Sequence, residues 1–369
     1  MPAFIPGLTL NDYFYQEAVQ PLIAAHFPDL IYSAALVGTG SEILGFDTAM
    51  STDHGWGPRL MLFLRQSDYE QQHTALYETL RQHLPATFRG YPVGFQVSTA
   101  PGDNGTMLLD DTPEDGQPVN HLVKVFSIET FFNDYLNVPN VHHMRPVDWL
   151  TCSEQALLEL TKGAVYYDGL DIQAIRDKLT YYPDDVWRYQ MAAVWTRIGQ
   201  EEHLAPRAGY VGDNIGSWII ASRLVRDIMR LCFLMKRQYV PYPKWFGTGF
   251  QRLDCAEKLS PLLEQVLAGE TWQKRETALC AAYEIIANMH NTLSITPPLD
   301  SRSQQFHERP FNVLHAWRFA DALIATITDD IVKAIAEKTR IGGIDIFSDN
   351  TDFLEDTRLH LHLQALYVD

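Results

Sequence analysis

A stretch near the N-terminus, Gly38 to Leu64, combines residue types that can bind phosphate and metal. Gly40 and Ser41 follow an apolar segment, and a glycine there lets the backbone approach a phosphate closely while N–H groups and the hydroxyl donate hydrogen bonds. Asp53 comes twelve residues after Ser41, just before a second apolar segment, where a rigid carboxylate can ligate Mg²⁺. Asp47, in the same loop, is the expected second ligand. The alternative is that these residues simply form turns.

Other side chains near this stretch could assist such chemistry. Arg59 opens the second apolar segment, and its guanidinium could clamp a phosphate or form an ion pair with a neighbouring aspartate. His54 could orient a phosphate, or be an ordinary half-buried histidine. Glu129 ends the segment HLVKVFSIE and is the expected base for an attacking hydroxyl, unless it stabilises the start of the next helix. Asp110 and Asp111 are rival candidates for that base.

A second group of basic residues lies in the C-terminal half. The segment GSWIIASRLVRDIMRLCFLMKRQY is apolar on most of its circumference, yet at helical spacing a set of arginines falls within about 60°: Arg223, Arg226, Arg230 and Arg237. We expect this stripe to bind an anion, either a nucleoside triphosphate through Arg230 or internal acids such as those of YYPDDVW. Lys244 follows in QYVPYPKWFG, where it could contact a nucleotide or instead belong to a capped helix end.

The pattern of apolar residues predicts the elements that position these groups. Segments rich in β-branched and aromatic residues predict strands at 32–37, 59–64, 92–98 and 121–128. Helical periodicity predicts helices at 11–26 and 69–84, and then long helices from about residue 147 to residue 338. The fold class is therefore α+β, with a small mixed sheet in residues 1–146 and an α-helical bundle in residues 147–369.

Composition narrows the classes of function. The chain has 369 residues and a formal net charge of −17, which disfavours nucleic acid and anionic membranes as partners. No apolar run approaches the roughly 20 residues that span a bilayer, so a cytoplasmic protein is expected. The four cysteines are widely spaced and predict neither a zinc site nor disulfide bonds.

The order of apolar strand, Gly-Ser, a gap of about a dozen residues, Asp and a second strand resembles the polymerase-beta-like nucleotidyltransferase superfamily, including the kanamycin and lincosamide nucleotidyltransferases. More closely, GSEILGFDTAMSTDHGWGPRLMLFL, YVPYPKWFG, RPFNV and IGGIDIFSDNTDFL are similar to the DUF4037 family of nucleotidyltransferase-like proteins. The superfamily resemblance implies a sheet that carries the metal site and a helical domain that contacts acceptor and nucleotide.

One position departs from that pattern, because the superfamily usually has Asp-x-Asp and this chain has Gly55 two residues after Asp53. We expect Asp47 to replace the missing carboxylate. The leading hypothesis is a Mg²⁺-dependent nucleotidyltransferase that moves AMP from ATP onto the hydroxyl of a small molecule, with a cationic acceptor favoured by the acidic charge. The alternatives are a transferase that modifies a protein or tRNA, and a catalytically silent nucleotide sensor.

Overall fold

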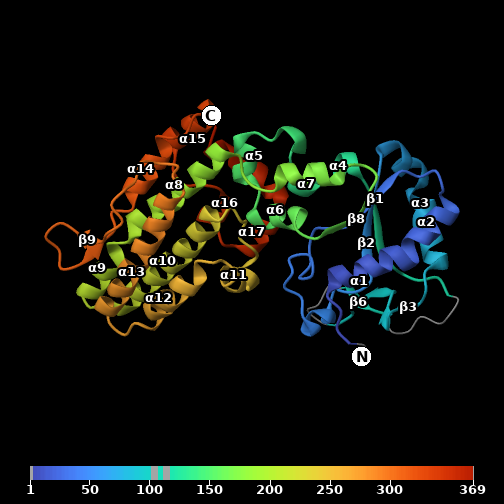
Figure 1. The fold of residues 1–369 in the computed structure, drawn as a ribbon, viewed down its shortest axis with the longest axis horizontal. Coiled ribbons are helices and arrows are strands. Elements are labelled where there is room, and N and C mark those ends of the chain that lie inside the picture. The colour runs from blue at the N-terminus through green and yellow to red at the C-terminus, as the bar shows by residue number, and fades with distance from the viewer. Residues whose placement is uncertain (1–2, 101–106, 111–116, 369) are drawn as a thin grey trace. The chain divides into compact units, whose positions relative to one another are not determined.

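The protein divides into two compact units in a computed structural model that describes residues 3–100, 107–110 and 117–368, and of Asp53 only the backbone (Figure 1). Unit 1 comprises Met1–His143 and Ala156–Thr180, and unit 2 comprises Met144–Gln155 and Tyr181–Asp369. A mixed sheet in unit 1 and a helical bundle in unit 2 confirm the α+β class.

The central sheet of unit 1 has four strands in the order β7-β2-β1-β8: β1 Tyr32–Leu36, β2 Arg59–Leu64, β7 Leu122–Ser127 and β8 Ala164–Asp168. The pair β1 and β2 is antiparallel, as is the pair β1 and β8, whereas β2 and β7 are parallel. The structure confirms the strands expected at 32–37, 59–64 and 121–128 to within a residue. The strand expected at 92–98 is shorter, because β5 covers Phe95–Val97.

Alternating side chains give the two faces of this sheet different roles. In β2, Leu60, Leu62 and Leu64 are buried in the core beneath the N-terminal helices. Successive residues of a strand point to opposite faces, so Arg59 and Met61 lie on the other face. The helices around the core are α1 Gly7–Phe14, α2 Gln20–His26 and α3 Gln66–His83, with a π-helical stretch at Tyr15–Val19. The face that carries Arg59 and Met61 is covered farther along, because Phe63 is buried against Phe131 and Phe132, and only its Arg59–Met61 end is half-buried.

Further short elements complete unit 1. They are β3 Thr87–Phe88, β4 Tyr91–Pro92, β6 Met107–Leu109, α4 Ile128–Leu136, a 3-10 turn Val141–His143, α6 Glu154–Thr161 and α7 Ile172–Leu179. A 3-10 helix, Ala49–Asp53, lies in the loop between β1 and β2.

Strand β8 is the main difference from the elements expected after residue 147. The segment AVYYD pairs with β1, so Ala156–Thr180 joins unit 1 instead of the helical lobe. Gly163 makes this pairing possible, because it has φ +81° and a Cβ there would lie 2.1 Å from Leu36 O. The hydroxyl of Ser33 donates to Asp168 Oδ1 at 2.9 Å and fixes the far end of the strand.

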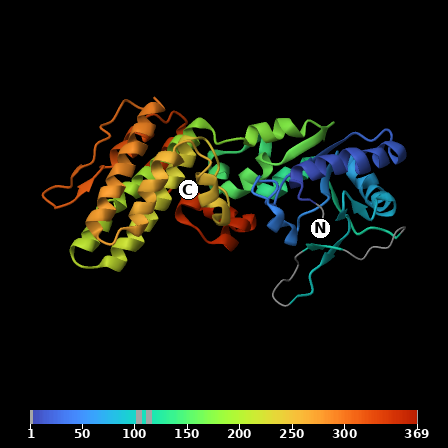
Figure 2. The ribbon, with the colours of Figure 1, turned by 60° about the horizontal axis from the view of Figure 1, so that its bottom comes forward.

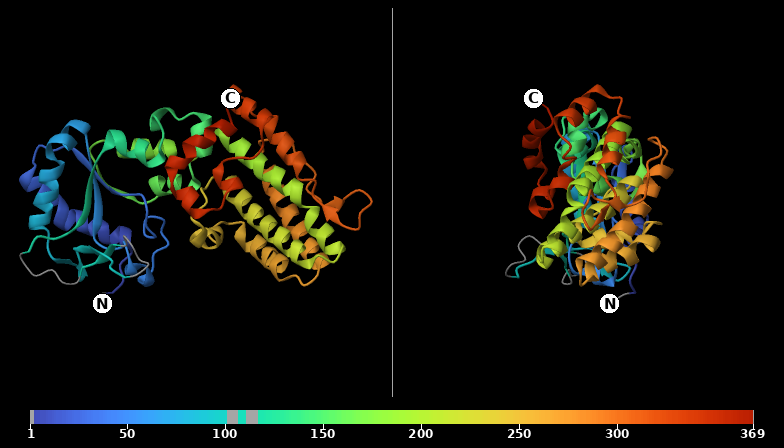
Figure 3. Two further views of the ribbon diagram at one scale, coloured as in Figure 1. Left: turned by 180° about the vertical axis from the view of Figure 1, so that it is seen from behind. Right: turned by 90° about the vertical axis from the view of Figure 1, so that its left-hand side faces the viewer.

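Unit 2 is a helical bundle (Figures 2 and 3). Its helices are α5 Pro146–Thr151, α8 Asp184–Glu201, α9 Leu204–Tyr210, α10 Asn214–Met235, α11 Pro243–Phe250, α12 Ala256–Ala268, α13 Trp272–Thr292, α14 Trp317–Ile324, α15 Asp330–Lys338, α16 Ile344–Phe347, α17 Thr351–Glu355 and α18 Thr357–His360. A hairpin of β9 Gln304–Gln305 and β10 Asn312–Val313 interrupts the helices. Aspartate and threonine caps start three helices, because Asp213, Thr271 and Asp329 accept backbone N–H groups of the following turn. Among the described residues, no helix is long and apolar enough to cross a membrane.

Candidate functional site

A pocket of about 440 Å³ lies against the sheet of unit 1, at the end of β2 that carries Arg59. Its walls come from the end of β1, the loop before β2, the first residues of β2, strand β7 and helix α4. The lining residues are Leu36, Val37, Gly38, Thr39, His54, Gly55, Arg59, Leu60, Met61, Met107, Leu122, Lys124, Phe126, Phe131 and Tyr135. Its volume falls within the range of small-molecule sites. We call it the sheet pocket.

Arg59 is held in place by the loop that precedes it. Its Nε donates to Glu42 Oε1 at 2.8 Å and its Nη2 donates to Thr39 O at 2.7 Å, while Nη2 also pairs with the Glu42 carboxylate. The Glu42 side chain is buried, so this ion pair fixes the guanidinium at the edge of the sheet pocket. The sequence predicted an ion pair with a neighbouring aspartate as one alternative for Arg59, and the partner is a glutamate.

Lys124 is a second cation in the lining of the sheet pocket. Strands β2 and β7 are parallel and in register, so Lys124 lies beside Met61 and two residues along from the Arg59–Leu122 pair. Diagonal neighbours on one face of a sheet lie within reach of long side chains. Among the described residues that line the pocket, the ionised side chains are therefore Arg59 and Lys124, and His54 is titratable.

Aromatic rings form the inner wall of the pocket. Phe126 and Phe131 have ring centroids 4.9 Å apart, and Phe131 lies 5.7 Å from Tyr135. The Tyr135 hydroxyl donates to the Glu159 carboxylate, and burial together with that charge raises the pKa of Tyr135. The backbone N–H of Gly38 donates to Glu159 O at 2.9 Å. This wall is apolar with a neutral phenol, which suits the flat part of a ligand.

Gly40 and Ser41 form a turn beside the sheet pocket but are not part of its lining. Leu44 N donates to Gly40 O at 3.3 Å, and Phe46 N donates to Ser41 O at 2.8 Å. Gly40 has φ +149°, and a Cβ there would lie 2.3 Å from Arg59 Nη2. The glycine therefore allows the ion pair of Arg59 and Glu42 to pack under the turn, and a role in binding phosphate stays a prediction.

Asp47 has a structural partner set. Its Oδ2 accepts hydrogen bonds from Gly7 N at 2.7 Å and from Trp56 Nε1 at 3.1 Å. Gly7 is the first residue of α1, and a carboxylate at the N-terminus of a helix is favoured by the helix dipole. These bonds attach the loop to α1, and the described geometry does not place Asp47 in the lining of the sheet pocket.

The segment from Asp53 to Gly55 enters the sheet pocket from the loop. Asp53 ends the 3-10 helix, and its side chain lies outside the described part of the structure. His54 and Gly55 line the pocket, and Gly55 N donates to Met107 O at 2.7 Å. Gly55 has φ +64°, so the chain turns here and the extended backbone of β2 starts only at Arg59. The departure from Asp-x-Asp thus involves the backbone as well as the missing carboxylate.

Glu129 does not join His54 and Arg59. Arg59 pairs with Leu122 at the first end of β7, whereas Glu129 follows Ser127 at the other end, roughly 16 Å away at the usual strand rise. Glu129 lies in the first turn of α4, where its Oε2 accepts from Ser127 Oγ at 3.0 Å. Its position is therefore that of the alternative stated from the sequence, in which Glu129 stabilises the start of a helix. Of the rival bases, Asp110 N donates to Gly94 O at 2.9 Å in the strand region before β7, and Asp111 lies outside the described residues.

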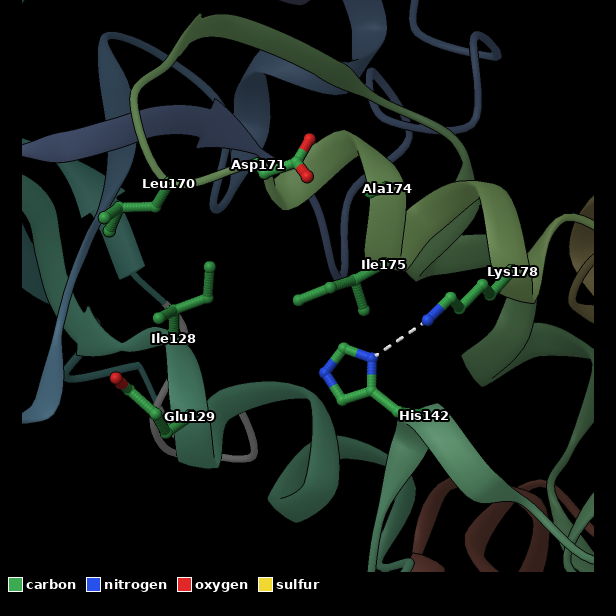
Figure 4. A pocket seen from close by; sticks show the side chains of 8 residues that line it. All are labelled: Ile128, Glu129, His142, Leu170, Asp171, Ala174, Ile175 and Lys178. Carbon is green, nitrogen blue, oxygen red and sulfur yellow. Dashed lines mark hydrogen bonds between the residues drawn. The ribbon is translucent and has the colours of Figure 1, made fainter.

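Glu129 instead lines a different pocket of about 320 Å³, formed by α4, α7 and the turn at Val141–His143 (Figure 4). Lys178 points toward the His142 ring, with Nζ 3.4 Å from Nδ1. Asp171 starts α7 with φ +59°. This pocket mixes charges of both signs, in contrast to the cationic sheet pocket.

The arginines of the expected stripe pair with acids inside unit 2. Only Arg223, Arg226 and Arg230 lie on α10, because the helix ends at Met235 and Arg237 follows it with φ +49°, so the expectation of one helical stripe of four was wrong for Arg237. The pairs are Arg223 with Glu201, Arg226 with Asp349, Arg230 with Glu154 and Arg237 with Asp184. Asp184 belongs to YYPDDVW, so one of the internal partners named from the sequence is correct. Arg230 is 8% exposed, and its Nη1 donates to Glu154 Oε1 at 3.1 Å. The described contacts of Arg230 are thus internal, and its role toward a nucleotide stays a prediction.

Lys244 is an exposed residue of α11. Its Nζ lies 5.1 Å from the centroid of the Trp245 ring. Pro243 is the first residue of the helix, and the preceding residue, Tyr242, donates its backbone N–H to Gln155 Oε1 at 2.6 Å. The segment QYVPYPKWFG, which was expected to contact a nucleotide or to cap a helix end, therefore contains the start of a helix. Lys244 belongs to unit 2, and its contact with a nucleotide stays a prediction.

The described residues of the sheet pocket do not fit a pair of divalent metal ions. Mg²⁺ prefers carboxylate oxygens, whereas Lys124 and Arg59 would repel it and Gly55 has no side chain to offer. Within the described part of the chain, no group of three or more His, Cys, Asp or Glu side chains is arranged to hold a metal. The donor set instead suits an anion.

Lys124 lines the sheet pocket but is not among the residues predicted from the sequence, where Glu129 was the expected residue of HLVKVFSIE. Strand alternation in that segment would have placed Lys124 on one face with Leu122 and Phe126, and a lysine in the middle of a β-rich run is the signal that was available.

Comparisons with known proteins bear on the family. Residues 149–246 match DUF4037, a domain of unknown function. A solved structure described as a nucleotidyltransferase-like protein from Exiguobacterium sibiricum 255-15 is similar at 14% sequence identity over 87% of this chain and 92% of that chain, with a TM-score of 0.31. A comparison with curated proteins found no match. The DUF4037 match includes Arg230 and Lys244 but not the sheet pocket residues before 149. This match confirms a resemblance to DUF4037 over residues 149–246.

Proposed function

We propose that unit 1 binds a nucleoside triphosphate through its phosphates in the sheet pocket, that this binding does not require a divalent metal ion, and that the protein senses the nucleotide without transferring part of it. The observation that carries the proposal is the parallel register of β2 and β7, which places Lys124 diagonally from Arg59 on the same face of the sheet, where both line the pocket. Two cations at one edge of a pocket match the charge of a phosphate chain.

The rest of the sheet pocket supports a nucleotide over a simple anion. Phe126, Phe131 and Tyr135 give an aromatic wall next to the cations, and aromatic rings stack on bases. Gly38 and Gly55 have positive φ values of 90° and 64°, so the backbone at the rim carries no side chain that would block a ligand. The resemblance to nucleotidyltransferase-like families favours a nucleotide among the ligands with this chemistry.

Mg²⁺-dependent transfer of AMP to a small-molecule hydroxyl, the leading hypothesis from the sequence, stays a prediction that depends on Asp53. Asp53 directly precedes two residues that line the sheet pocket, His54 and Gly55. The described side chains around it offer cations where metal chemistry needs carboxylates, so we place the sensor first.

The test is the binding of ATP to the full chain by calorimetry, once in EDTA and once in excess Mg²⁺, with pyrophosphate release measured in parallel. We expect ATP dissociation constants within about threefold of each other, since the same two cations contact both forms, and no pyrophosphate above the protein-free control. Binding that requires Mg²⁺, or pyrophosphate release, would support a transferase instead. Absence of ATP binding in both conditions would contradict the proposal outright.

A variant separates the two functions further. Asp53→Asn removes the carboxylate that a metal-dependent transferase needs, so such an enzyme would lose pyrophosphate release. A sensor keeps its affinity for ATP in EDTA. Incubation of lysate with labelled ATP covers the remaining hypothesis, because a labelled protein or tRNA would identify a transferase with a macromolecular acceptor.

A further inference from the structure

A cluster of imidazole rings packs against Phe306 in unit 2, whereas the sheet pocket belongs to unit 1. Phe306 follows β9 in the hairpin, and its N–H donates to Phe311 O at 3.0 Å. The Phe306 centroid lies 4.8 Å from His203, 4.5 Å from His307 and 6.1 Å from His315. His203 lies in the turn between α8 and α9, His307 in the loop between β9 and β10, and His315 between β10 and α14.

Two of these histidines have positive φ, a backbone conformation that residues other than glycine rarely adopt. His307 has φ +53° and His315 has φ +59°. His315 is held there by the buried Glu202 carboxylate, which accepts from Leu314 N at 2.7 Å and from Ala316 N at 2.9 Å. Such conformations persist only when the surroundings enforce them, and they concentrate at binding sites. The clamp therefore fixes the direction in which the His315 ring is presented.

The charges that act on these imidazoles are positive. Burial lowers the pKa of His203, and Arg309 and His307 lower it further. Burial, Arg318 and His307 likewise lower the pKa of His315. Arg318 is fixed by backbone carbonyls, since its Nη2 donates to Leu314 O at 2.7 Å and to Asp300 O at 3.2 Å. In a chain with a formal net charge of −17, this is a local concentration of cations.

The carboxylates of the elements packed around the cluster are engaged with backbone N–H groups. Glu202, which follows the end of α8, clamps the His315 segment as described, and burial raises its pKa to about 7, so it also titrates near neutral pH. The Asp300 carboxylate pairs with Arg302 and interacts with the charge of Arg318. Glu276 of α13 accepts from Asn312 N, and Glu284 of α13 accepts from Ser303 N at 2.9 Å. Glu308, next to His307, is exposed on the hairpin. Glu202 and the acids of α13 thus support the backbone that presents the cations.

We infer that the Phe306 cluster, made of His203, Phe306, His307, Arg309, His315 and Arg318, is a binding site for a small dianion of the phosphate monoester type. The arginines supply permanent positive charge, and the imidazoles donate N–H groups once protonated. This site is independent of the nucleotide site proposed in unit 1.

Binding of a dianion at this cluster is coupled to protonation. In the free protein the neighbouring cations hold the pKa of His203 and of His315 below 6.5, and a bound dianion raises those pKa values. A group whose pKa rises on binding takes up protons with the ligand. Affinity is therefore complete below the pKa of the free protein and declines as the pH rises through the pKa of the complex.

Sulfate is the probe for the first test, because it remains a dianion between pH 6 and pH 8 and its own titration does not enter. The full chain carrying Lys124→Ala, which weakens anion binding at the sheet pocket, is titrated with sulfate at both pH values by calorimetry. We expect at least tenfold tighter binding at pH 6, equivalent to about 1.4 kcal/mol. Equal affinity at the two pH values, or no binding at either, would overturn the inference.

Variants locate the site. His307→Asn and His315→Asn together keep side chains that tolerate positive φ, so the backbone is preserved while the imidazoles are lost. This double variant should weaken the pH dependence, leaving the part due to His203, and Arg309→Gln should weaken sulfate binding tenfold at both pH values. His83→Asn, an exposed histidine of α3 in unit 1, is the matched control and should change nothing.

The second measurement does not depend on a variant that folds. Proton NMR of the imidazole C–H signals reports the pKa of each histidine with and without sulfate. An upward shift of the pKa at His203 and His315, with His83 unchanged, supports the site. Repeating the titration with a phosphate monoester tests the ligand class, and binding of sulfate but not of the monoester would reduce the site to one for inorganic anions and contradict the inference as stated.

Discussion

Cations occur in two different settings in this protein, the arginine stripe of α10 in unit 2 and the sheet pocket of unit 1. In the stripe each arginine faces an acid of the same unit, as Arg230 faces the buried Glu154. In the sheet pocket Arg59 also has an acidic partner, Glu42, but it lines a cavity together with Lys124. A stripe of arginines on a helix is thus no evidence of a ligand by itself, whereas cations from two strands that line one pocket are.

Removing Arg230 gives the largest effect expected from this comparison. Arg230→Ala leaves Glu154 without its cation in a buried position, next to the buried carboxylate of Asp345. Loss of one partner of a buried ion pair costs about 3–5 kcal/mol. Urea unfolding of the full chain measures this free energy.

Arg223→Ala is the matched control for Arg230→Ala on the same helix. Arg223 is 51% exposed and pairs with Glu201, so its loss should cost less than about 1 kcal/mol. Similar costs for the two variants would contradict the view that Arg230 serves the interior of unit 2.

Substitution of two glycines, Gly40 and Gly55, tests how the loop between β1 and β2 supports the sheet pocket. Gly40→Ala places a Cβ 2.3 Å from Arg59 Nη2 and 2.6 Å from Glu42 Oε2, so it should destabilise unit 1 by about 2 kcal/mol and disturb the Arg59 ion pair. Gly55→Ala meets nothing within 4 Å and should cost only the left-handed backbone, about 1 kcal/mol. Thermal unfolding compares them, and an equal or larger cost for Gly55→Ala would show that the described packing under Gly40 is incorrect.

The buried acid of the stripe predicts a pH dependence of stability. Burial and the charge of Asp345 raise the pKa of Glu154 to about 7, although Arg230 acts in the opposite direction. The pKa in the folded state is then above the unfolded value, so the folded state binds more protons between pH 4.5 and pH 7, and ionisation of Glu154 lowers stability as the pH rises through this range.

Glu154→Gln removes that titration. The free energy of unfolding of the variant, relative to the unaltered protein, should therefore rise from pH 5 to pH 7.5. Glu70→Gln, at an exposed position of α3, should show no such trend. A relative stability of Glu154→Gln that falls with pH would reverse the assigned direction of the pKa.

The sequence predicted much of the fold because the signals were local. The run RLMLFL is apolar and bounded by turn residues, and β2 covers it without error. The segment AVYYD was missed as a strand because it is short and lies between helical patterns, and its pairing with β1 is a long-range contact. Asp184 was correctly named as a partner of the arginines, since YYPDDVW places two acids together before the arginine-bearing helix in the sequence.

The candidate site was harder to predict because it depends on strand direction. Whether β7 runs parallel or antiparallel to β2 decides which end of β7 meets Arg59, and a sequence does not give that choice. The parallel arrangement takes Glu129 to the far end and brings Lys124 to the pocket. Likewise, the hydrogen bonds from Gly7 and Trp56 to Asp47 join residues that no spacing rule connects.

The measurement that tests the central claim most directly compares Lys124→Ala with Lys162→Ala in ATP binding, by calorimetry in EDTA. Lys162 is an exposed lysine of unit 1 that is not part of the described pocket linings, so it controls for net charge. A hydrogen bond to a charged group is worth about 1.5–3 kcal/mol, so Lys124→Ala should weaken ATP binding by roughly ten- to a hundredfold, with unchanged thermal stability. Lys162→Ala should bind ATP like the unaltered protein. Equal ATP affinities for the two variants would contradict the assignment of the sheet pocket as the nucleotide site.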